Sequence, residues 1–226
     1  MRLFILLSML VFTTSCVSVD QPKQTKEYPS RWWSDIPKNK KRSWEISPAS
    51  VKPPVVVISK RNELGVLSNF AATPFSYNEK KYASIEGLWQ STKFPDPQDI
   101  KDPRHKIKGW PFTREQVEQM TAFKAKRAGK VASKLMQKHK INWVSFNGER
   151  MSYRENKKGR FYELIRGAME AKVSQNKKVA KVLESTGNLI LVPDHRQGKK
   201  APPAWKYHEI YMEIRLARRM GSGDAP

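Results

Sequence analysis

The sequence reads LSNF at residues 67–70 and IEGLWQSTKF at residues 85–94, and these two segments decide the fold. The second segment predicts an α-helix, because Glu86, Gln90 and Lys93 recur at the i, i+4 and i+7 spacing that places side chains on one helix face. Its other positions are strongly apolar, so we expect this helix to lie inside the fold. A buried carboxylate and ammonium are costly unless they are paired, and groups kept in such a place commonly have a function.

The polar face of this helix has the length of a small ligand. A rise of about 1.5 Å per residue separates Glu86 from Lys93 by roughly 10 Å along the axis, so one ligand with a sugar at one end and a phosphate at the other could contact both. Ser84 is suited to cap the helix, which places Glu86 in the first turn. There the helix dipole favours a negative charge, so we expect a lowered carboxyl pKa unless burial opposes it. The alternative is a solvent-exposed polar face without a function.

The residues of these two segments and of the hairpin between them form a motif. It comprises the LSNF segment, followed by Pro74, Phe75, Tyr82, Ser84, Glu86, Gln90, Lys93 and Phe94. The motif resembles the opening of the NADAR family, named for NAD and ADP-ribose, which includes the YbiA-like N-glycosidases. The resemblance runs from about residue 55 to residue 216. It implies an α+β, mainly α-helical fold, in which a single compact domain holds a few short strands and hairpins. It also implies hydrolysis of the N-glycosidic bond of an ADP-ribose-type or ribosylamine-type small molecule, and we expect no cofactor.

The resemblance further implies the residues of the site. Glu86 corresponds to a catalytic residue, which would stabilise an oxocarbenium-like sugar or activate the water, and Asp194 would assist it. Two carboxylates around a glycosidic centre suit a transition state whose charge develops on the sugar ring. The substrate-binding residues implied are Ser68, Asn69, Gln90, Lys93, Lys130, Trp143 and Trp205.

Three of these positions have alternative interpretations. Lys130 ends a segment with Ala and Gly that resembles the family, but it could be a solvated lysine in a lysine-rich chain. Trp143 could belong to the core, and the hairpin and loop inserted over 144–158 depart from the family pattern at the point where Trp143 is aligned with it. Asp194 lies in a region that lacks the Gly-rich basic segment of the YbiA-like enzymes, so the diphosphate of the ligand could be held differently.

Periodicity and turn signals predict the remaining elements. β-Branched runs indicate buried strands at 55–59 and 189–192, and polar turns indicate hairpins at 75–82 and 144–153. Caps and apolar faces indicate helices at 113–120, 160–174, 177–184 and 209–220.

The amino terminus has the features of an export signal. An apolar run over 3–12, interrupted only by Ser8 and too short to span a bilayer, precedes small residues and Cys16, the one cysteine of the chain. The pattern resembles a bacterial lipobox. We therefore expect a lipoprotein signal peptide over 1–15, lipidation of Cys16 and a location in the cell envelope, at the outer membrane or facing the periplasm. The alternatives are an ordinary signal peptide with an incidental cysteine, and a cytoplasmic protein.

Composition divides the rest of the chain. Residues 16–50 are basic and rich in proline, which predicts a flexible tether. The tryptophans of this segment could dock on the domain or on a membrane interface, and docking on the domain is the favoured interpretation. The domain spans 51–220, and residues 221–226 form a disordered tail.

The net charge is strongly positive. The chain has 43 Lys and Arg against 21 Asp and Glu, which gives +22, or +21 after loss of Arg2 with residues 1–15. Such a charge attracts nucleic acid, anionic envelope polymers and anionic membranes. The four histidines are scattered, and the sequence has no GxGxxG or P-loop motif, so we expect no metal site and no Rossmann-type nucleotide site.

Three functions remain open at this stage. The leading one is an N-glycosidase. The second is a non-catalytic module for ADP-ribose or a nucleotide, which would use the same pocket without turnover. The third is a basic envelope protein that binds anionic polymers or nucleic acid. ADP-ribosylated nucleic acid would satisfy both the charge and the pocket.

Overall fold

The computed structural model describes residues 27–198 and 200–222, and this part of the chain is mainly helical with a few short strands. The predicted α+β fold class is confirmed. The α-helices are α1 Ile85–Ser91, α2 Arg114–Glu118, α3 Ala122–Lys138, α4 Arg160–Gln175, α5 Lys177–Ser185 and α6 Tyr207–Ser222. The strands are β1 Val55–Val57, β2 Phe75–Tyr77, β3 Lys80–Tyr82, β4 Val144–Phe146, β5 Glu149–Met151 and β6 Ile190–Val192. Short 3-10 helices include η1 Ser30–Trp33, η3 Glu63–Leu67 and η5 Pro203–Trp205.

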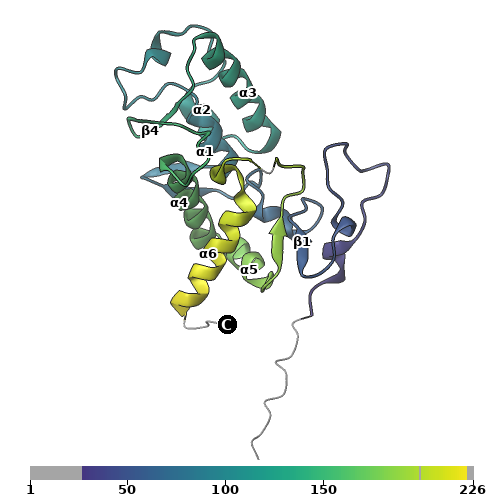
Figure 1. Cartoon of the computed structure of the whole chain (residues 1–226). Coiled ribbons are helices and arrows are strands. Elements are labelled where there is room, and N and C mark those ends of the chain that lie inside the picture. The colour runs from purple at the N-terminus through teal and green to yellow at the C-terminus, as the bar shows by residue number, and fades with distance from the viewer. Residues whose placement is uncertain (1–26, 199, 223–226) are drawn as a thin grey trace, which may run out of the picture.

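Helix α1 occupies the centre of the fold. It contacts α2 and α3 on one side and α4 on another, while α5 and α6 lie beyond α4 (Figure 1). The main core includes residues from α1, α4, α5 and α6, and a smaller core lies under α3. The smaller core comprises Phe94, Val117, Met120, Ala125, Ala128 and Ala132. The polar face predicted for this helix therefore lies where the two cores of the molecule meet.

The two hairpins form as the sequence predicts, and the structure adds a strand pairing that the sequence did not predict. β2 and β3 form one antiparallel hairpin, and β4 and β5 form another, which turns at Asn147 and Gly148 with positive φ angles of 49° and 78°. β1 and β6 are parallel partners, with Val55 opposite Ile190 and Val57 opposite Val192. This long-range pairing brings the loop after β6 beside the chain that follows β1. Both of these segments contribute residues to the candidate site.

Helix α1 is shorter than the sequence predicts. The helix is capped by Ser84 as expected, since the Ser84 hydroxyl accepts a hydrogen bond from the Gly87 N–H at 2.9 Å. It ends at Ser91, and the Ser91 hydroxyl donates to the carbonyl of Leu88, while Pro95 follows shortly after. Because proline disfavours a continuing helix, Lys93 lies in the turn after α1 rather than on it.

The described part of the expected tether, residues 27–50, is packed against the domain. Trp32 is only 1% exposed and belongs to the main core, and the Trp33 indole N–H donates to the carbonyl of Val55 at 2.8 Å. Docking of these tryptophans on the domain is thus confirmed. Burial of these large aromatic side chains holds part of the predicted flexible tether against the domain, despite the polar composition around them.

Several predictions about the chain ends lie outside the described residues. These are the signal peptide over 1–15, the lipidation of Cys16 and the tail from 223 to 226, whereas Gly221 and Ser222 continue α6. None of the helices over 27–198 and 200–222 combines the length and the apolar character needed to cross a membrane.

Candidate active site

A cavity of about 690 Å³ opens beside α1. Its walls come from α1, α3, the LSNF segment, the β5–α4 connection, the loop after β6, the start of α6 and the packed amino-terminal segment. Its volume lies in the range of small-molecule sites. The lining contains these residues predicted for the site: Ser68, Asn69, Glu86, Gln90, Lys93 and Trp205.

The two motif segments are joined directly by the backbone. The N–H of Glu86 donates to the carbonyl of Asn69 at 2.9 Å, and the Ser84 hydroxyl donates to the carbonyl of Met120 at 2.8 Å. The first bond fixes the LSNF segment against the start of α1, and the second fixes α1 against the chain before α3. The polar side chains of both segments are therefore held on one cavity wall.

Glu86 is the buried acid of this wall. Its side chain accepts a hydrogen bond from the Gln90 amide at 2.8 Å, across one helical turn, and the residue is 8% exposed. Burial raises the pKa of the Glu86 carboxyl, although the Gln90 bond and the ammonium groups of Lys93, Lys126 and Lys60 oppose the shift. The helix terminus is expected to lower this pKa unless burial opposes it, and burial is the larger effect. A carboxylate with a raised pKa is a stronger base than an exposed one.

Lys93 supplies a buried cation to the same cavity. The residue is 9% exposed, and its ammonium lies 5.9 Å from the centre of the Tyr153 ring. Burial lowers the pKa of Lys93 to about 8, with the Glu86 carboxylate opposing that shift. The lysine is therefore charged at neutral pH and loses its charge in mildly alkaline solution.

Two residues of the cavity lining carry buried hydrogen-bond acceptors. Asn69 Oδ1 and Gln90 Oε1 have no hydrogen-bond partner within the described part of the chain. A Cβ atom on Gly129 of α3 would lie 1.6 Å from Gln90 Oε1, so only glycine leaves room for this amide. Because buried polar atoms are rarely left unpaired, these acceptors are suited to hydroxyl or N–H groups of a ligand.

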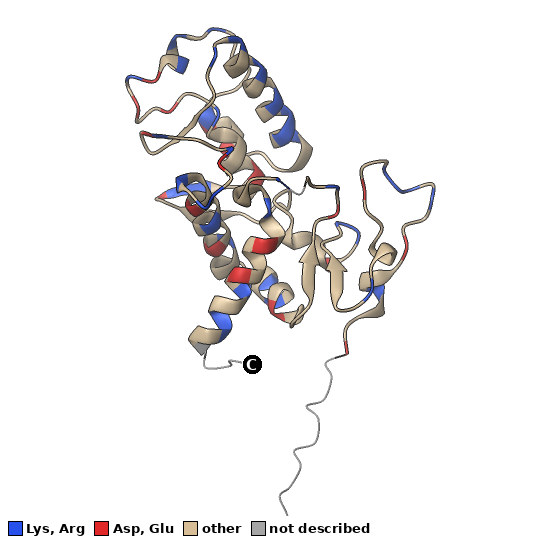
Figure 2. Ribbon diagram, viewed as in Figure 1, with Lys and Arg blue, Asp and Glu red and all other residues tan. Residues whose placement is uncertain are grey.

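The charge of the cavity favours an anionic ligand. Among the described residues that line it, Glu86 is the one acid, and the cations are Lys60, Lys93, Lys126, Arg154 and Arg196. Lys and Arg also recur along α3, which forms one wall (Figure 2). Such a surplus of cations attracts phosphate groups.

Asp194 lies behind the wall rather than in the lining. Its carboxylate is fully buried, accepts a hydrogen bond from the Lys60 ammonium, and lies 3.1 Å from His195 Nδ1. Burial raises the pKa of Asp194, but the bonds with His195 and Lys60 outweigh burial and hold this pKa below its ordinary value. Lys60 and His195 themselves line the cavity, and the Asp194 carboxylate contacts both of them from outside the described lining.

Two of the predicted substrate-binding residues are not among the described lining residues. Lys130 is exposed on α3, since the side of that helix facing α1 is taken by Gly129 and small apolar residues. The Trp143 ring lies between two guanidinium groups, 4.5 Å from that of Arg104 and 4.5 Å from that of Arg150. The structure therefore does not bring these two residues into the described lining of the cavity.

Trp205 lines the cavity as expected. Its indole N–H donates to the carbonyl of Tyr153 at 3.1 Å, and its ring lies 6.5 Å from that of Trp89. The lining also contains residues that were not predicted, and among these Trp44 and Lys126 come from segments far apart in the sequence. No local motif marks such residues, because only the tertiary fold brings them to the cavity.

Comparison with known proteins gives a limited result. No protein-family model matches the chain, and no curated protein matches it. Among solved structures, the chain is similar to the NMR structure of the E. coli protein YbiA, with 19% sequence identity and a TM-score of 0.48. The alignment covers 78% of this chain and 92% of that protein.

Proposed function

We propose that the protein is an N-glycosidase that hydrolyses an ADP-ribose-type or ribosylamine-type substrate in the cavity beside α1. The observation that carries the proposal is the buried Glu86 carboxyl, which is hydrogen-bonded by Gln90 and lies in a cavity whose lysine and arginine residues are its other charged lining groups. The resemblance of the LSNF and α1 motif to the NADAR family supplies the type of reaction. The carboxyl group and the cations that the cavity brings together support the proposal.

The proposed reaction uses Glu86 as a base and as a counter-charge. Water adds to the anomeric carbon of the sugar while the bond to nitrogen breaks, and the leaving nitrogen takes the electron pair of that bond and a proton. Positive charge develops on the sugar ring, where an ionised Glu86 would stabilise it. The same carboxylate accepts the proton of the attacking water and, once protonated, delivers it to the leaving nitrogen, so the proton lost by the water is the one that the nitrogen gains. The Gln90 amide holds the carboxylate in place.

The cations of the cavity are proposed to bind the phosphate part of the substrate. Lys93 is buried within the lining and is suited to a phosphate of the ligand, and Arg154 lies near it beside the Tyr153 ring. A charge-assisted contact to phosphate is stronger than a contact between neutral groups. We propose that the substrate binds with its sugar near Glu86 and its phosphate near Lys93.

A direct screen tests this function. The purified protein is incubated with ADP-ribosylated and ribosylamine compounds, and release of the free sugar and of the nitrogen-containing product is followed by liquid chromatography and mass spectrometry. The proposal expects both products in equal amounts from at least one compound. Binding of ADP-ribose without any product across the panel would contradict it and would favour the non-catalytic binding module, which needs the same cavity.

A further inference from the structure

Three aromatic residues form a cluster in the cavity lining. Trp44 comes from the amino-terminal segment, Phe70 ends the LSNF segment and Phe123 lies in the first turn of α3. The Phe70 and Phe123 rings are 5.1 Å apart at 83°, and the Trp44 and Phe123 rings are 6.2 Å apart at 67°. We call these three residues the aromatic cluster.

The aromatic cluster is open to solvent. Trp44 is 41% exposed and Phe123 is 45% exposed, whereas the other described aromatic side chains, apart from Trp205, are buried or partly buried. Exposed aromatic surface that adjoins a cavity is typical of a binding site. The faces of such rings accept other planar rings with little regard to their hydrogen-bonding groups.

Two ammonium groups lie beside these rings. Lys60 Nζ is 5.4 Å from the Trp44 ring centre and 5.3 Å from that of Phe70. Lys126 Nζ is 5.7 Å from the Phe70 ring centre. The cluster therefore presents aromatic faces and positive charge within the same few ångströms, which suits a planar ring joined to a phosphate.

The position of Trp44 is fixed by its neighbour in the chain. The Glu45 carboxylate accepts hydrogen bonds from Arg61 Nε at 2.9 Å and from the terminal guanidinium nitrogen at 2.7 Å. The next residue, Ile46, donates its N–H to the carbonyl of Asp194 at 2.8 Å. These bonds hold the segment against the loop after β6 and keep Trp44 beside Lys60.

We propose that the aromatic cluster is a subsite for the nucleotide end of the ligand, in which Trp44 stacks on the base and Lys60 and Lys126 contact the adjoining phosphate. The proposal rests on the proposed function in one respect, namely that the reacting sugar lies at Glu86. It assigns a binding role to the amino-terminal segment, which composition alone describes as a tether.

The test compares two phosphate ligands that differ in the presence of a base. Adenosine 5′-monophosphate and ribose 5-phosphate are titrated by isothermal calorimetry into the full chain and into Trp44→Ala, Trp44→Phe and Leu216→Ala. Leu216 is an exposed apolar residue on α6 outside the described lining and serves as the control. Circular dichroism and thermal unfolding verify that each variant keeps its fold.

The proposal expects a loss specific to the base. Trp44→Ala should weaken the affinity for adenosine 5′-monophosphate at least tenfold and change the affinity for ribose 5-phosphate by less than twofold. Trp44→Phe should retain part of the affinity for the nucleotide. Leu216→Ala should bind both ligands as the unmodified protein does. Equal weakening of both ligands by Trp44→Ala, an unchanged affinity for the nucleotide, or no nucleotide binding by the unmodified protein would overturn it.

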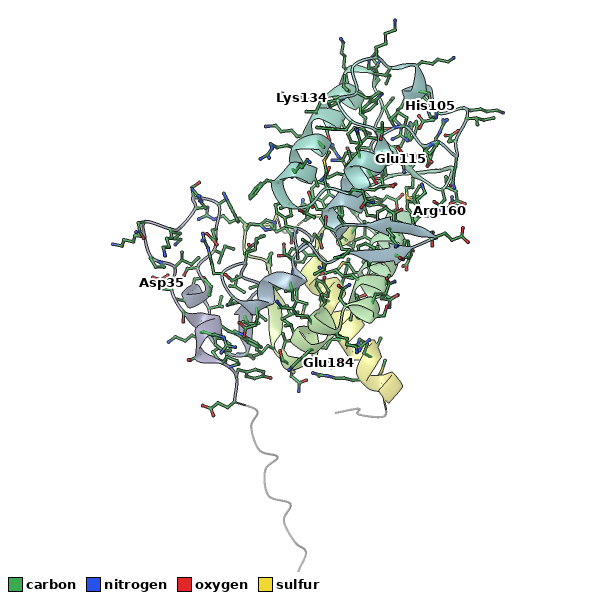
Figure 3. The ribbon with its side chains drawn as sticks, turned by 180° about the vertical axis from the view of Figure 1, so that it is seen from behind. Asp35, His105, Glu115, Lys134, Arg160 and Glu184 are labelled. Atoms are coloured by element: carbon green, nitrogen blue, oxygen red, sulfur yellow. The ribbon has the colours of Figure 1, made fainter. Side chains whose placement is uncertain are left out.

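These outcomes separate the subsite from the reaction. If the product screen finds no turnover while Trp44→Ala loses the nucleotide selectively, the subsite stands and the glycosidase does not. If turnover is found and Trp44→Ala binds the nucleotide with unchanged affinity, the glycosidase assignment stands and the subsite does not. A second comparison, Lys126→Ala against Lys134→Ala, tests the phosphate contact, because Lys134 is an exposed residue of the same helix outside the described lining (Figure 3). Only Lys126→Ala should weaken ribose 5-phosphate, and equal effects would overturn that contact.

Discussion

The backbone N–H of Glu86 donates to the carbonyl of Asn69 at 2.9 Å, so one hydrogen bond joins the acid of the cavity to the residue whose buried amide oxygen has no partner in the described part of the chain. Both residues belong to segments that stand out in the sequence. A further hydrogen bond, from the Lys172 side chain of α4 to the carbonyl of Ser68 at 3.0 Å, also holds the LSNF segment in place. The geometry of the site therefore depends on backbone contacts that side-chain substitutions at the cavity do not remove.

Gly129 makes room for the Gln90 amide, so Gly129→Ala should reduce activity more than stability. The added Cβ would meet the end of the Gln90 side chain, which must turn away and give up its bond to Glu86. Alanine favours a helix over glycine by about 0.5–1 kcal/mol, which offsets part of the strain. We expect at least a tenfold loss of kcat with a change in the free energy of unfolding of about 1 kcal/mol or less.

The control for this substitution is Gly221→Ala. Among the described residues, nothing lies within 4 Å of a Cβ built at Gly221 near the end of α6. Steady-state kinetics and urea unfolding of both variants decide the matter. Activity of Gly129→Ala equal to that of Gly221→Ala would show that the Gln90 position does not affect the reaction.

Affinity for a phosphate-bearing ligand should fall as Lys93 loses its proton. The pKa of Lys93 is about 8, so the residue is mostly charged at pH 7 and mostly neutral at pH 9.5. Loss of one charge-assisted contact of about 1.5 kcal/mol corresponds to roughly a tenfold rise of Kd for ADP-ribose over this interval. Titrations across this pH range measure the change. Lys93→Arg keeps its charge throughout and should show a flat profile, and parallel profiles for the two proteins would exclude Lys93 as the titrating contact.

Lys172 should make folding stability depend on pH. Its ammonium is fully buried, and burial lowers its pKa from 10.5 to about 7. Between these two values the unfolded chain binds more protons than the folded one, so the free energy of unfolding rises with pH, by up to about 1.4 kcal/mol per pH unit. Lys172→Met removes this contribution. Urea unfolding from pH 7 to 10 should give a smaller slope for the variant, and identical slopes would mean that Lys172 does not titrate in this range.

The basic surface should bind polyanions in a salt-dependent manner. Exposed cations on α3 include Lys124, Lys126, Arg127, Lys130 and Lys134. We propose that they attract ADP-ribosylated nucleic acid, whose affinity should fall with a log–log salt slope of about −0.7 to −0.9 per phosphate contact. Free ADP-ribose engages few charges and should respond weakly. Equal slopes for the two ligands in parallel titrations would show that this surface has no part in substrate choice.

Local signals predict much of this fold. Val55–Val57 and Ile190–Val192 are recognisable as strands from their β-branched or apolar runs, although Ile190 is exposed, and Asn147 with Gly148 marks a hairpin turn. Each depends on neighbouring residues alone. The largest omission is α3, because its buried face consists mostly of alanine and glycine and its other positions are dominated by lysine, which conceals the helical period.

Local sequence signals likewise identify only some residues of the candidate site. Asn69, Glu86 and Gln90 could be identified because they lie in short motifs around one helix. Trp44 could not, since its contact with Phe123 joins positions far apart in the sequence. Asp194 was expected in the site, but its burial behind Lys60 depends on the pairing of β1 with β6, which the sequence does not specify.

The substitution Glu86→Gln tests the central claim most directly. The amide has nearly the same volume as the acid but neither its charge nor its basicity. Binding of ADP-ribose and turnover of the compound identified in the product screen are measured side by side on the variant and the unmodified protein. The account predicts a Kd within about threefold of the unmodified protein and a loss of kcat of at least a thousandfold, which corresponds to about 4 kcal/mol of transition-state stabilisation. Full turnover by Glu86→Gln would contradict the assignment of Glu86 as the base and counter-charge of the reaction.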